Sequence, residues 1–299
     1  MMNISRIKNR ADELLLTCQP QVIRIMTIMM LIGLIPSLFS GSGNIFISLI
    51  SLILTIVFIA FGHGYVVTGL KVVRNRQDSL SDDDAFVGFT RFKELFSTYL
   101  ITGVIMFAIV VAIILVLTLL FSLLFGSYLS WSASHSMTVY SNLSGGGDYS
   151  YLFNLLLVNP VMVLLIILFV VIVIIAVAII SVYLFAVPYL LEQYHMKNMV
   201  AVKESFAMMK NHIWDMIKLE LSFLGWMLLT VIAQSVVTQL LSFIPILGSM
   251  IGAIVGGFVG IYTYIPKYHI SQTILFEEIA YYRYDQPQQS TMDNQGEHL

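Results

Sequence analysis

The sequence predicts an all-α, polytopic membrane protein with six transmembrane helices arranged as three hairpins, each preceded by a cytoplasmic amphipathic surface helix. Three observations support this fold class: the composition, the lengths of the apolar runs and the distribution of Lys and Arg. Hydrophobic residues make up 58% of the 299 residues and charged residues 11%, against roughly 25% charged in an average soluble domain. A soluble chain of this length needs more polar surface, so we expect lipid to cover much of this one.

Six apolar runs are long enough to cross a bilayer, whose core of about 30 Å requires about 20 mostly apolar residues per helix. They are residues 22–39, 45–70, 100–125, 155–187, 219–241 and 246–265. Polar breaks, SGSGN (residues 40–44) and SFIPILGS (residues 242–249), suit the turns of the first and third hairpins. Residues 1–284 therefore form one predicted transmembrane domain, and the polar residues 285–299 a predicted disordered cytoplasmic tail.

The Lys and Arg residues all fall on one side of this arrangement. They lie before or just inside the first run, between the second and third, between the fourth and fifth, and after the sixth. Because cytoplasmic loops retain Lys and Arg, we expect a cell-membrane protein with both termini in the cytoplasm. The N-terminal stretch has no apolar run before Val22, so we expect the first membrane helix to remain as an anchor and not to be a cleaved signal peptide.

Three cytoplasmic stretches read as short amphipathic helices before the hairpins: SRIKNRADELL, DDDAFVGFTRFKELF and NMVAVKESFAMMKNHIW. In the second, we expect Ser81 or Asp82 to cap the helix, and the spacing predicts one helical face formed by Phe86, Phe89, Phe92 and Phe96. In the third, a comparable stripe is formed by Val202, Phe206, Met209 and Ile213. We favour helices that pack at the membrane surface over a dedicated regulatory or lipid-sensing role.

The stretch AVKESFAMMKNHIWDMIKLELSFLGWMLL (residues 201–229) is the most specific in the chain. It resembles the signature of a bacterial integral membrane protein family catalogued as domain of unknown function 975, in which A-x-x-x-S-x-x-x-M-x-x-x-x-W leads into L-x-L-S-F-x-G-W. The matching positions are Ala201, Ser205, Met209, Trp214, Leu219, Leu221, Ser222, Phe223, Gly225 and Trp226. Weaker matches are ISRIKNRADELL, AFVGF and VPYLL, and the C-terminal end departs from the family's P-Y and F-Y-E pattern. The resemblance implies a membrane bundle and no established chemistry.

Glycines recur every four residues along the sixth run, at Gly248, Gly252, Gly256 and Gly260. This spacing places them in one smooth stripe, which lets another helix approach closely where lipid offers no hydrophobic drive. We expect helix packing at these residues. The partner helix is either in the same chain, which we favour, or in a second protomer.

No constellation of residues predicts catalysis, a cofactor or a metal. The six histidines form no H-x-x-x-H or H-E-x-x-H pattern, and we interpret His63, in FGHGY, as a histidine at a helix end and not as a ligand or proton relay. The chain has no phosphate-binding G-x-x-x-x-G-K loop, so it supplies no ATPase of its own. The single cysteine, Cys18, is expected to be inert. Glu220 lies about two residues into the fifth run, and we interpret it as an interfacial anchor and not as a catalytic carboxylate.

The residues therefore favour a non-enzymatic multi-pass membrane protein that acts through lipid or protein contacts, in envelope homeostasis or as an accessory subunit of a membrane complex. The alternative is a transporter or permease component that lacks its own ATPase. An intramembrane enzyme would need paired polar groups at depth, which the sequence does not predict. The expected partners are the lipid bilayer and another membrane protein, and nothing in the sequence suggests nucleic acid.

Overall fold

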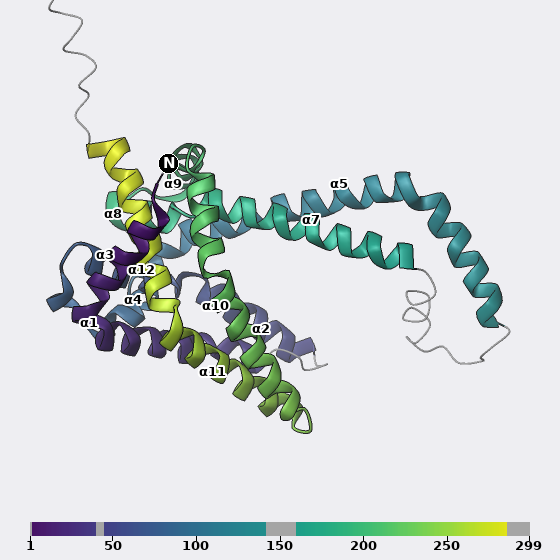
Figure 1. Ribbon diagram of the computed structural model, residues 1–299, viewed down its shortest axis with the longest axis horizontal. Helices are drawn as coiled ribbons and strands as arrows, with labels where there is room; N and C mark the ends of the chain where they lie inside the picture. The colour runs from purple at the N-terminus through teal and green to yellow at the C-terminus, as the bar shows by residue number, and fades with distance from the viewer. Residues whose placement is uncertain (1, 40–44, 142–159, 286–299) are drawn as a thin grey trace, which may run out of the picture. The chain divides into compact units, whose positions relative to one another are not determined.

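The computed structural model of the protein describes residues 2–39, 45–141 and 160–285. Within these ranges the chain is helical and contains no β-strand (Figure 1). The elements are α1 (Ile4–Gly33), η1 (Ile35–Phe39), α2 (Ile45–Val57), η2 (Phe58–Ala60), α3 (His63–Val73), η3 (Gln77–Ser79), η4 (Asp82–Phe86), α4 (Val87–Thr90), α5 (Phe92–Ser141), α7 (Pro160–Leu184), α8 (Val187–Tyr194), α9 (Asn198–Met209), α10 (Ile213–Leu240), α11 (Pro245–Thr263), α12 (Ile265–Ala280) and η5 (Tyr281–Asp285).

Several of these helices are long and apolar enough to cross a membrane, which agrees with the predicted membrane class. Five qualify by length and composition among the described residues: Ile4–Gly33, Ile45–Val73, Phe92–Leu123, Val163–Tyr194 and Ile213–Leu240. A sixth forms if Gly248–Thr263 and Ile265–Tyr284, which are bent by 57° at Tyr264, count as one span. The predicted run 155–187 begins outside the described residues. Residues 142–153, between the third and fourth predicted runs, and the tail after residue 285 also lie outside them.

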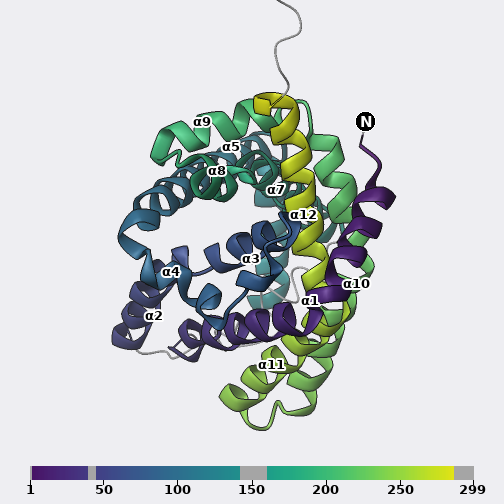
Figure 2. The same ribbon diagram turned by 90° about the vertical axis from the view of Figure 1, so that its left-hand side faces the viewer.

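The chain divides into two compact units, of which the first contains residues 1–102 and 182–299. Its centre is the packing of α1 and α3 on α12, with α8 against α3 and against α9 (Figure 2). The spacing of three and four residues between the buried side chains of α1 explains this helix: Ile7, Ala11, Leu15, Cys18, Val22, Ile25, Met26 and Met29 form one apolar face. Asn3 caps its start by accepting a hydrogen bond from the Arg6 N–H at 3.2 Å, as short polar side chains do at helix N-termini.

The second unit, residues 103–181, contains the rest of α5 and most of α7. These helices lie side by side, with Phe121 and Phe169 in edge-to-face contact at 5.3 Å between ring centroids. Apolar side chains surround both helices, and Phe107 and Leu164 are 70% and 64% exposed. A helix that is apolar on all sides is typical of a lipid-facing span.

The three-hairpin arrangement is not confirmed by the packing. α10 and α11 do form a tight antiparallel pair, but α1 packs mainly on α12 and η4. The first predicted surface helix is continuous with the first span, since both belong to α1, which runs through Pro20. A separate surface helix there is therefore not confirmed.

The second predicted surface helix is interrupted, and its four phenylalanines do not share one face. Ser81 precedes a 3₁₀ turn as its N-cap, and α4 ends before Arg91. Phe89 packs on Phe58 and Phe61, while Phe92 joins a different cluster around Leu95. The reason is the close approach of the chain at Gly88, where a Cβ atom would lie 2.6 Å from the Phe61 Cα atom.

Candidate functional site

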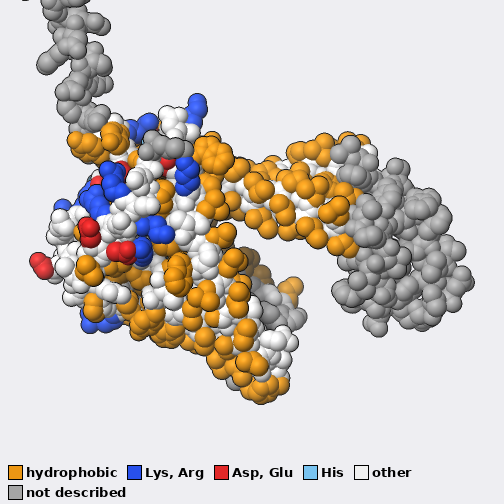
Figure 3. Space-filling view, viewed as in Figure 1, with side chains coloured by type: hydrophobic (Ala, Val, Ile, Leu, Met, Phe, Trp, Pro, Cys, Tyr) orange, Lys and Arg blue, Asp and Glu red, His pale blue; other side chains and the backbone are white. Residues whose placement is uncertain are grey.

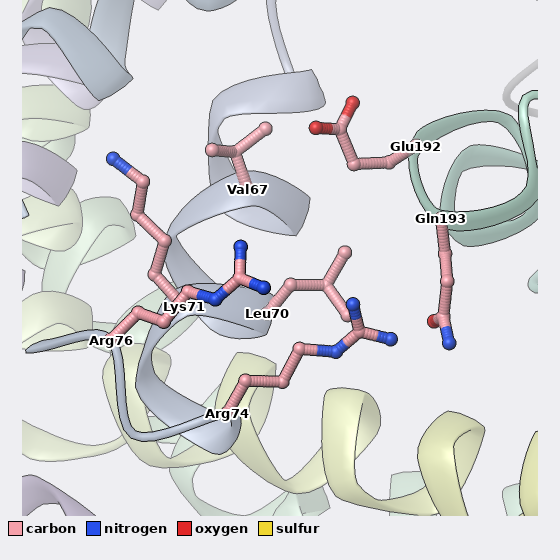
Figure 4. A pocket seen from close by; sticks show the side chains of 7 residues that line it. All are labelled: Val67, Leu70, Lys71, Arg74, Arg76, Glu192 and Gln193. Atoms are coloured by element: carbon pink, nitrogen blue, oxygen red, sulfur yellow. The ribbon is translucent and has the colours of Figure 1, made fainter. Parts of the chain in front are cut away.

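A small basic pocket lies between the C-terminal end of α3 and the helix α8 in the first unit (Figure 4). Its volume is about 190 Å³, which is below the roughly 300–1,000 Å³ of sites for drug-sized ligands. The lining residues are Val67, Leu70, Lys71, Arg74, Arg76, Glu192 and Gln193. The pocket therefore suits a small polar group and has three cationic side chains on its α3 side.

The turn that ends α3 brings two arginines into this pocket. Asn75 has a left-handed backbone with φ of 55°, which asparagine tolerates better than most residues. The Arg76 N–H donates to the Lys71 carbonyl at 2.8 Å, the six-to-one hydrogen bond of a Schellman motif. This turn folds Arg76 back beside Arg74, and Figure 4 shows both guanidinium groups directed into the space between α3 and α8.

The three cations of the pocket differ in their partners. Lys71 turns away and donates to Asp84 Oδ1 and to the Ser79 carbonyl, both at 2.7 Å. Arg74 pairs through Nε with Glu277 Oε1 at 2.8 Å, which leaves its two Nη groups for a ligand. Arg76 makes no ion pair with any residue that the structure describes, and its side chain is exposed.

The α8 side of the pocket is formed by Glu192 and Gln193. The Oε1 atom of Gln193 is buried and has no hydrogen-bond donor among the described residues. The amide nitrogen of the same side chain is already engaged, since Nε2 donates to the Tyr194 hydroxyl at 3.2 Å. A buried oxygen without a donor costs about 1–3 kcal/mol, so Gln193 Oε1 is an unfavourable polar group beneath the wall of the pocket.

Glu192 connects the pocket to a polar network around a buried histidine. His63 is fully buried, with Nδ1 2.8 Å from the Tyr99 hydroxyl and Nε2 2.9 Å from Glu192 Oε2. Arg91 Nη1 donates to the same Oε2 at 2.7 Å and Nε to Glu94 at 3.1 Å. Both ring nitrogens of His63 are occupied and shielded, so the ring positions Glu192 and is not placed to exchange a proton with a ligand in the pocket.

A second polar cluster surrounds Glu220 on α10. The Tyr268 hydroxyl lies 2.7 Å from Oε1 and 2.8 Å from Oε2 of Glu220, and Gln272 Nε2 donates to Oε1 at 3.1 Å. Lys8 of α1 donates to the Ser222 carbonyl at 3.3 Å and lies over the Phe223 ring at 4.6 Å from its centroid. Glu220 therefore ties α10 to α12, which fits an anchoring role.

The residues of the family-like stretch divide into two sets. Facing inward are Ala201, Ser205, Met209, Leu219 and Phe223, all buried, and the Ser205 hydroxyl donates to the Tyr183 carbonyl at 2.6 Å. Exposed on the outer side are Trp214, Leu221 and Trp226, at 70%, 59% and 47%. Ser222 bonds within its own helix, to the Leu219 carbonyl at 2.7 Å, and Gly225 faces open space. The outward tryptophans suit lipid contact, because indole rings favour the membrane interface.

The four glycines of the predicted stripe are all buried and lie along the inner side of α11. A Cβ atom at Gly256 would be 2.9 Å from Gln234 Cβ, and one at Gly252 would be 3.0 Å from the Gln234 carbonyl oxygen. Gly248 similarly faces Leu241, and Gly260 faces Thr230 and Ile265. All four thus face α10 or the turn that follows it, so α11 packs on a helix of the same chain at these glycines.

Sequence reasoning missed the pocket residues and the partners of His63. Arg74 and Arg76 were counted only among the cationic loop residues, and Glu192 and Gln193 were not singled out, since no local spacing joins them. The glycines that flank His63 gave no signal of its partners, since Gly62 faces open space and Gly64 packs on Asp84 and Met29. Within the described part of the chain, no group of three or more His, Cys, Asp or Glu could hold a metal ion, and the expectation of no cofactor stays a prediction.

Comparison with known families gives one match. The model of a family described as "Protein of unknown function (DUF975)" matches residues 1–251, which include the basic pocket, His63 and the stretch 201–229. No curated protein and no solved structure matches the chain.

Proposed function

The chain belongs to the DUF975 family of proteins of unknown function, and from this premise we propose that it is a non-enzymatic, multi-pass membrane protein that acts by binding lipid or another membrane protein. Envelope homeostasis and service as an accessory subunit of a membrane complex are the roles that this activity fits. We also propose that it resides in the cell membrane with both termini in the cytoplasm. The distribution of Lys and Arg supports this orientation.

The observation that carries the proposal is the use of charged side chains to join helices. Arg6 and Lys267 pair with Glu278 and Asp12 across α1 and α12, at 2.9 and 2.5 Å. Arg74 pairs with Glu277, also on α12. Each exposed pair contributes little, about 0–1 kcal/mol, but together they set how the helix ends meet. Charged side chains that pair between helices support a role as a scaffold whose surface binds partners. A catalytic site would instead need acid and base groups that are not paired in this way.

The surface offers two kinds of contact for such binding. Figure 3 shows hydrophobic side chains covering α10 and α11, while Lys and Arg side chains gather around α8, α12 and the start of α10. Exposed apolar side chains on α10 include Leu228, Val231 and Leu240, and exposed apolar area of this extent marks a lipid or protein contact. The binding proposal accounts for both surfaces.

Co-purification from native membranes tests the proposal. The tagged protein is extracted with a membrane-solubilising polymer that retains neighbouring lipid, and bound lipids and proteins are identified by mass spectrometry. An unrelated multi-pass protein prepared in parallel is the control. We expect a lipid or protein enriched over the control, and the proposal is wrong if none is enriched. A co-purifying ATPase would instead favour the permease-component alternative.

A further inference from the structure

A groove runs along the outer face of α1, beside the end of α11. Its volume is about 520 Å³, within the range of about 300–1,000 Å³ that is typical of ligand pockets. Among its lining residues are Pro20, Ile23, Arg24, Thr27, Ile28 and Tyr262. We infer that this groove binds one phosphatidylethanolamine molecule, with an acyl chain along α1 and the headgroup at the ion pair of Arg24 and Asp82. The inference rests on the proposed function and deepens it by naming the class of lipid.

The packing of α11 on α1 explains why a groove is present. The two helices meet at Gly257 and Met30, where a Cβ atom on the glycine would collide with the methionine sulfur. The groove residues of α1 precede this contact along the chain, and the ring of Tyr262, which is 66% exposed, forms the other wall. Ile23 and Ile28 make the lining apolar, so it suits a flexible hydrocarbon chain better than a polar ligand.

The position of the groove along the predicted spans matches the headgroup region of a bilayer. Arg24 lies close to the start of the first predicted run, 22–39, and Tyr262 lies close to the end of the sixth, 246–265. Both of these ends are predicted to be cytoplasmic. Tyrosine favours the membrane interface and arginine extends its charge toward it, so a lipid in the groove would have its headgroup beside Arg24.

The ion pair at this end of the groove is complementary to a zwitterionic headgroup. Arg24 Nε donates to Asp82 Oδ1 at 2.7 Å, and no carboxylate of a described residue pairs with the Arg24 Nη groups. Guanidinium Nη groups donate hydrogen bonds to phosphate oxygens. Asp82 and the adjacent Asp83 are exposed, and their carboxylates repel further negative charge but accept hydrogen bonds from an ammonium group. The phosphate therefore binds Arg24 and the ammonium binds Asp82.

The headgroup has to supply the selectivity for one lipid. Bilayer hydrocarbon is as apolar as the groove, so an acyl chain gains only van der Waals packing there. Phosphatidylglycerol has no ammonium group for Asp82, and the ammonium of phosphatidylcholine has no N–H to donate. Phosphatidylethanolamine carries both the phosphate and the N–H donors that this ion pair can bind.

Competition among these three lipids tests the inference. The full chain is placed in nanodiscs that contain equal parts of phosphatidylethanolamine, phosphatidylcholine and phosphatidylglycerol with identical acyl chains, and the lipid it retains is measured by native mass spectrometry. We expect the wild type to retain phosphatidylethanolamine about threefold over each of the other two, the size expected for a contact between exposed charged groups.

Three variants make the test specific to the groove. Thr27→Trp fills the groove and should lose the retained lipid, whereas Thr55→Trp, the same change at an exposed threonine of α2, is the matched control and should keep it. Asp82→Asn removes the acceptor of the ammonium group and leaves Arg24 without its counter-charge, so the preference should move to phosphatidylglycerol. Because Asp82 is exposed, this variant tests the headgroup even if Thr27→Trp lowers stability.

Retention that Thr27→Trp removes, together with the change of preference in Asp82→Asn, supports the inference. Equal retention by wild type and Thr27→Trp overturns the groove assignment and leaves the co-purification test of the broader function unaffected. A wild type that retains the three lipids equally, or prefers phosphatidylglycerol, overturns the headgroup assignment. If Thr27→Trp loses a bound protein or a second copy of the chain but no lipid, the groove is a protein contact and the inference is wrong.

Discussion

The side chain of Glu192 links three segments of this protein through hydrogen bonds. Its Oε2 atom lies 2.9 Å from His63 Nε2 and accepts from Arg91 at 2.7 Å, so it joins α3, α8 and the break before α5. The next residue of α8, Gln193, lines the basic pocket. Adjacent positions on one short helix thus hold helices together and form part of the pocket wall.

Replacing this carboxylate should destabilise the protein measurably. Glu192→Gln removes the negative charge from a site with a fully buried histidine and an arginine, and we expect a loss of about 1.5–3 kcal/mol, the usual contribution of a hydrogen bond to a charged group. The measurement is thermal unfolding in detergent, where the midpoint should fall by several degrees. Glu13→Gln, at an exposed glutamate of α1, is the control. An unchanged midpoint in Glu192→Gln would contradict the assigned role.

At the scale of elements, the contact between α10 and α11 depends on the glycine stripe. A side chain at Gly256 meets Gln234 and the Thr230 carbonyl, at 2.9 and 3.3 Å for the first carbon alone. Gly256→Leu should therefore separate the helices at a cost of about 1–3 kcal/mol, typical of overpacking.

Gly225→Leu is the matched control for this prediction, because Gly225 lies on α10 with no heavy atom within 4 Å of its would-be Cβ. It should be neutral or slightly stabilising, since glycine is a poor helix former. Both variants are compared by thermal unfolding and by size-exclusion chromatography in detergent. Equal stability of the two variants would show that the stripe does not set this packing.

The contact between α9 and the C-terminal η5 segment should depend on pH. Glu204 accepts from Arg283 Nε and from the Tyr284 hydroxyl, each at 2.6 Å, and these hydrogen bonds lower the pKa of Glu204 below its ordinary value of 4.5. A lowered pKa means that the contact contributes its full stability above about pH 4.5 and loses it as the pH falls through the folded-state value.

Hydrogen exchange of α9 measures this effect. We expect faster exchange over Asn198–Met209 at pH 4 than at pH 6, after correction for the intrinsic rate, and Glu204→Gln should exchange fast at both values. The contribution is modest because the side chains are partly exposed, at 24% for Glu204 and 38% for Arg283. If the variant keeps the wild-type pH dependence, another group is responsible.

At the scale of the whole molecule, the orientation in the membrane can be tested directly. A single cysteine in residues 141–147, placed in a Cys18→Ser background, should react with a membrane-impermeant maleimide added to intact cells. A single cysteine at Asp285 should react only after the cells are opened. The natural Cys18 is buried, so its replacement removes background labelling. The reverse pattern would overturn the proposed orientation.

The membrane class and the presence of several long apolar helices were predictable from the sequence. Both depend on composition and on the lengths of apolar runs, whereas the first helix begins at Ile4 and ends at Gly33, well before the predicted run 22–39 ends. The predicted phenylalanine face at residues 86–96 was wrong, because the close approach of Gly88 to the Phe61 backbone divides that segment. Helical periodicity carries no information about such a tertiary contact.

The sequence by itself determined that lipid is the expected surrounding of much of this protein. The cost of exposing apolar surface to water adds up residue by residue, so it can be assessed without knowing which residues are in contact. Only the tertiary structure decided which polar side chains meet. Glu192 reaches His63 across 129 residues and Arg91 across 101, and Arg76 comes beside Arg74 through a turn at Asn75. Polar partners are chosen by how the helices pack, and that packing brings together residues that share no local pattern.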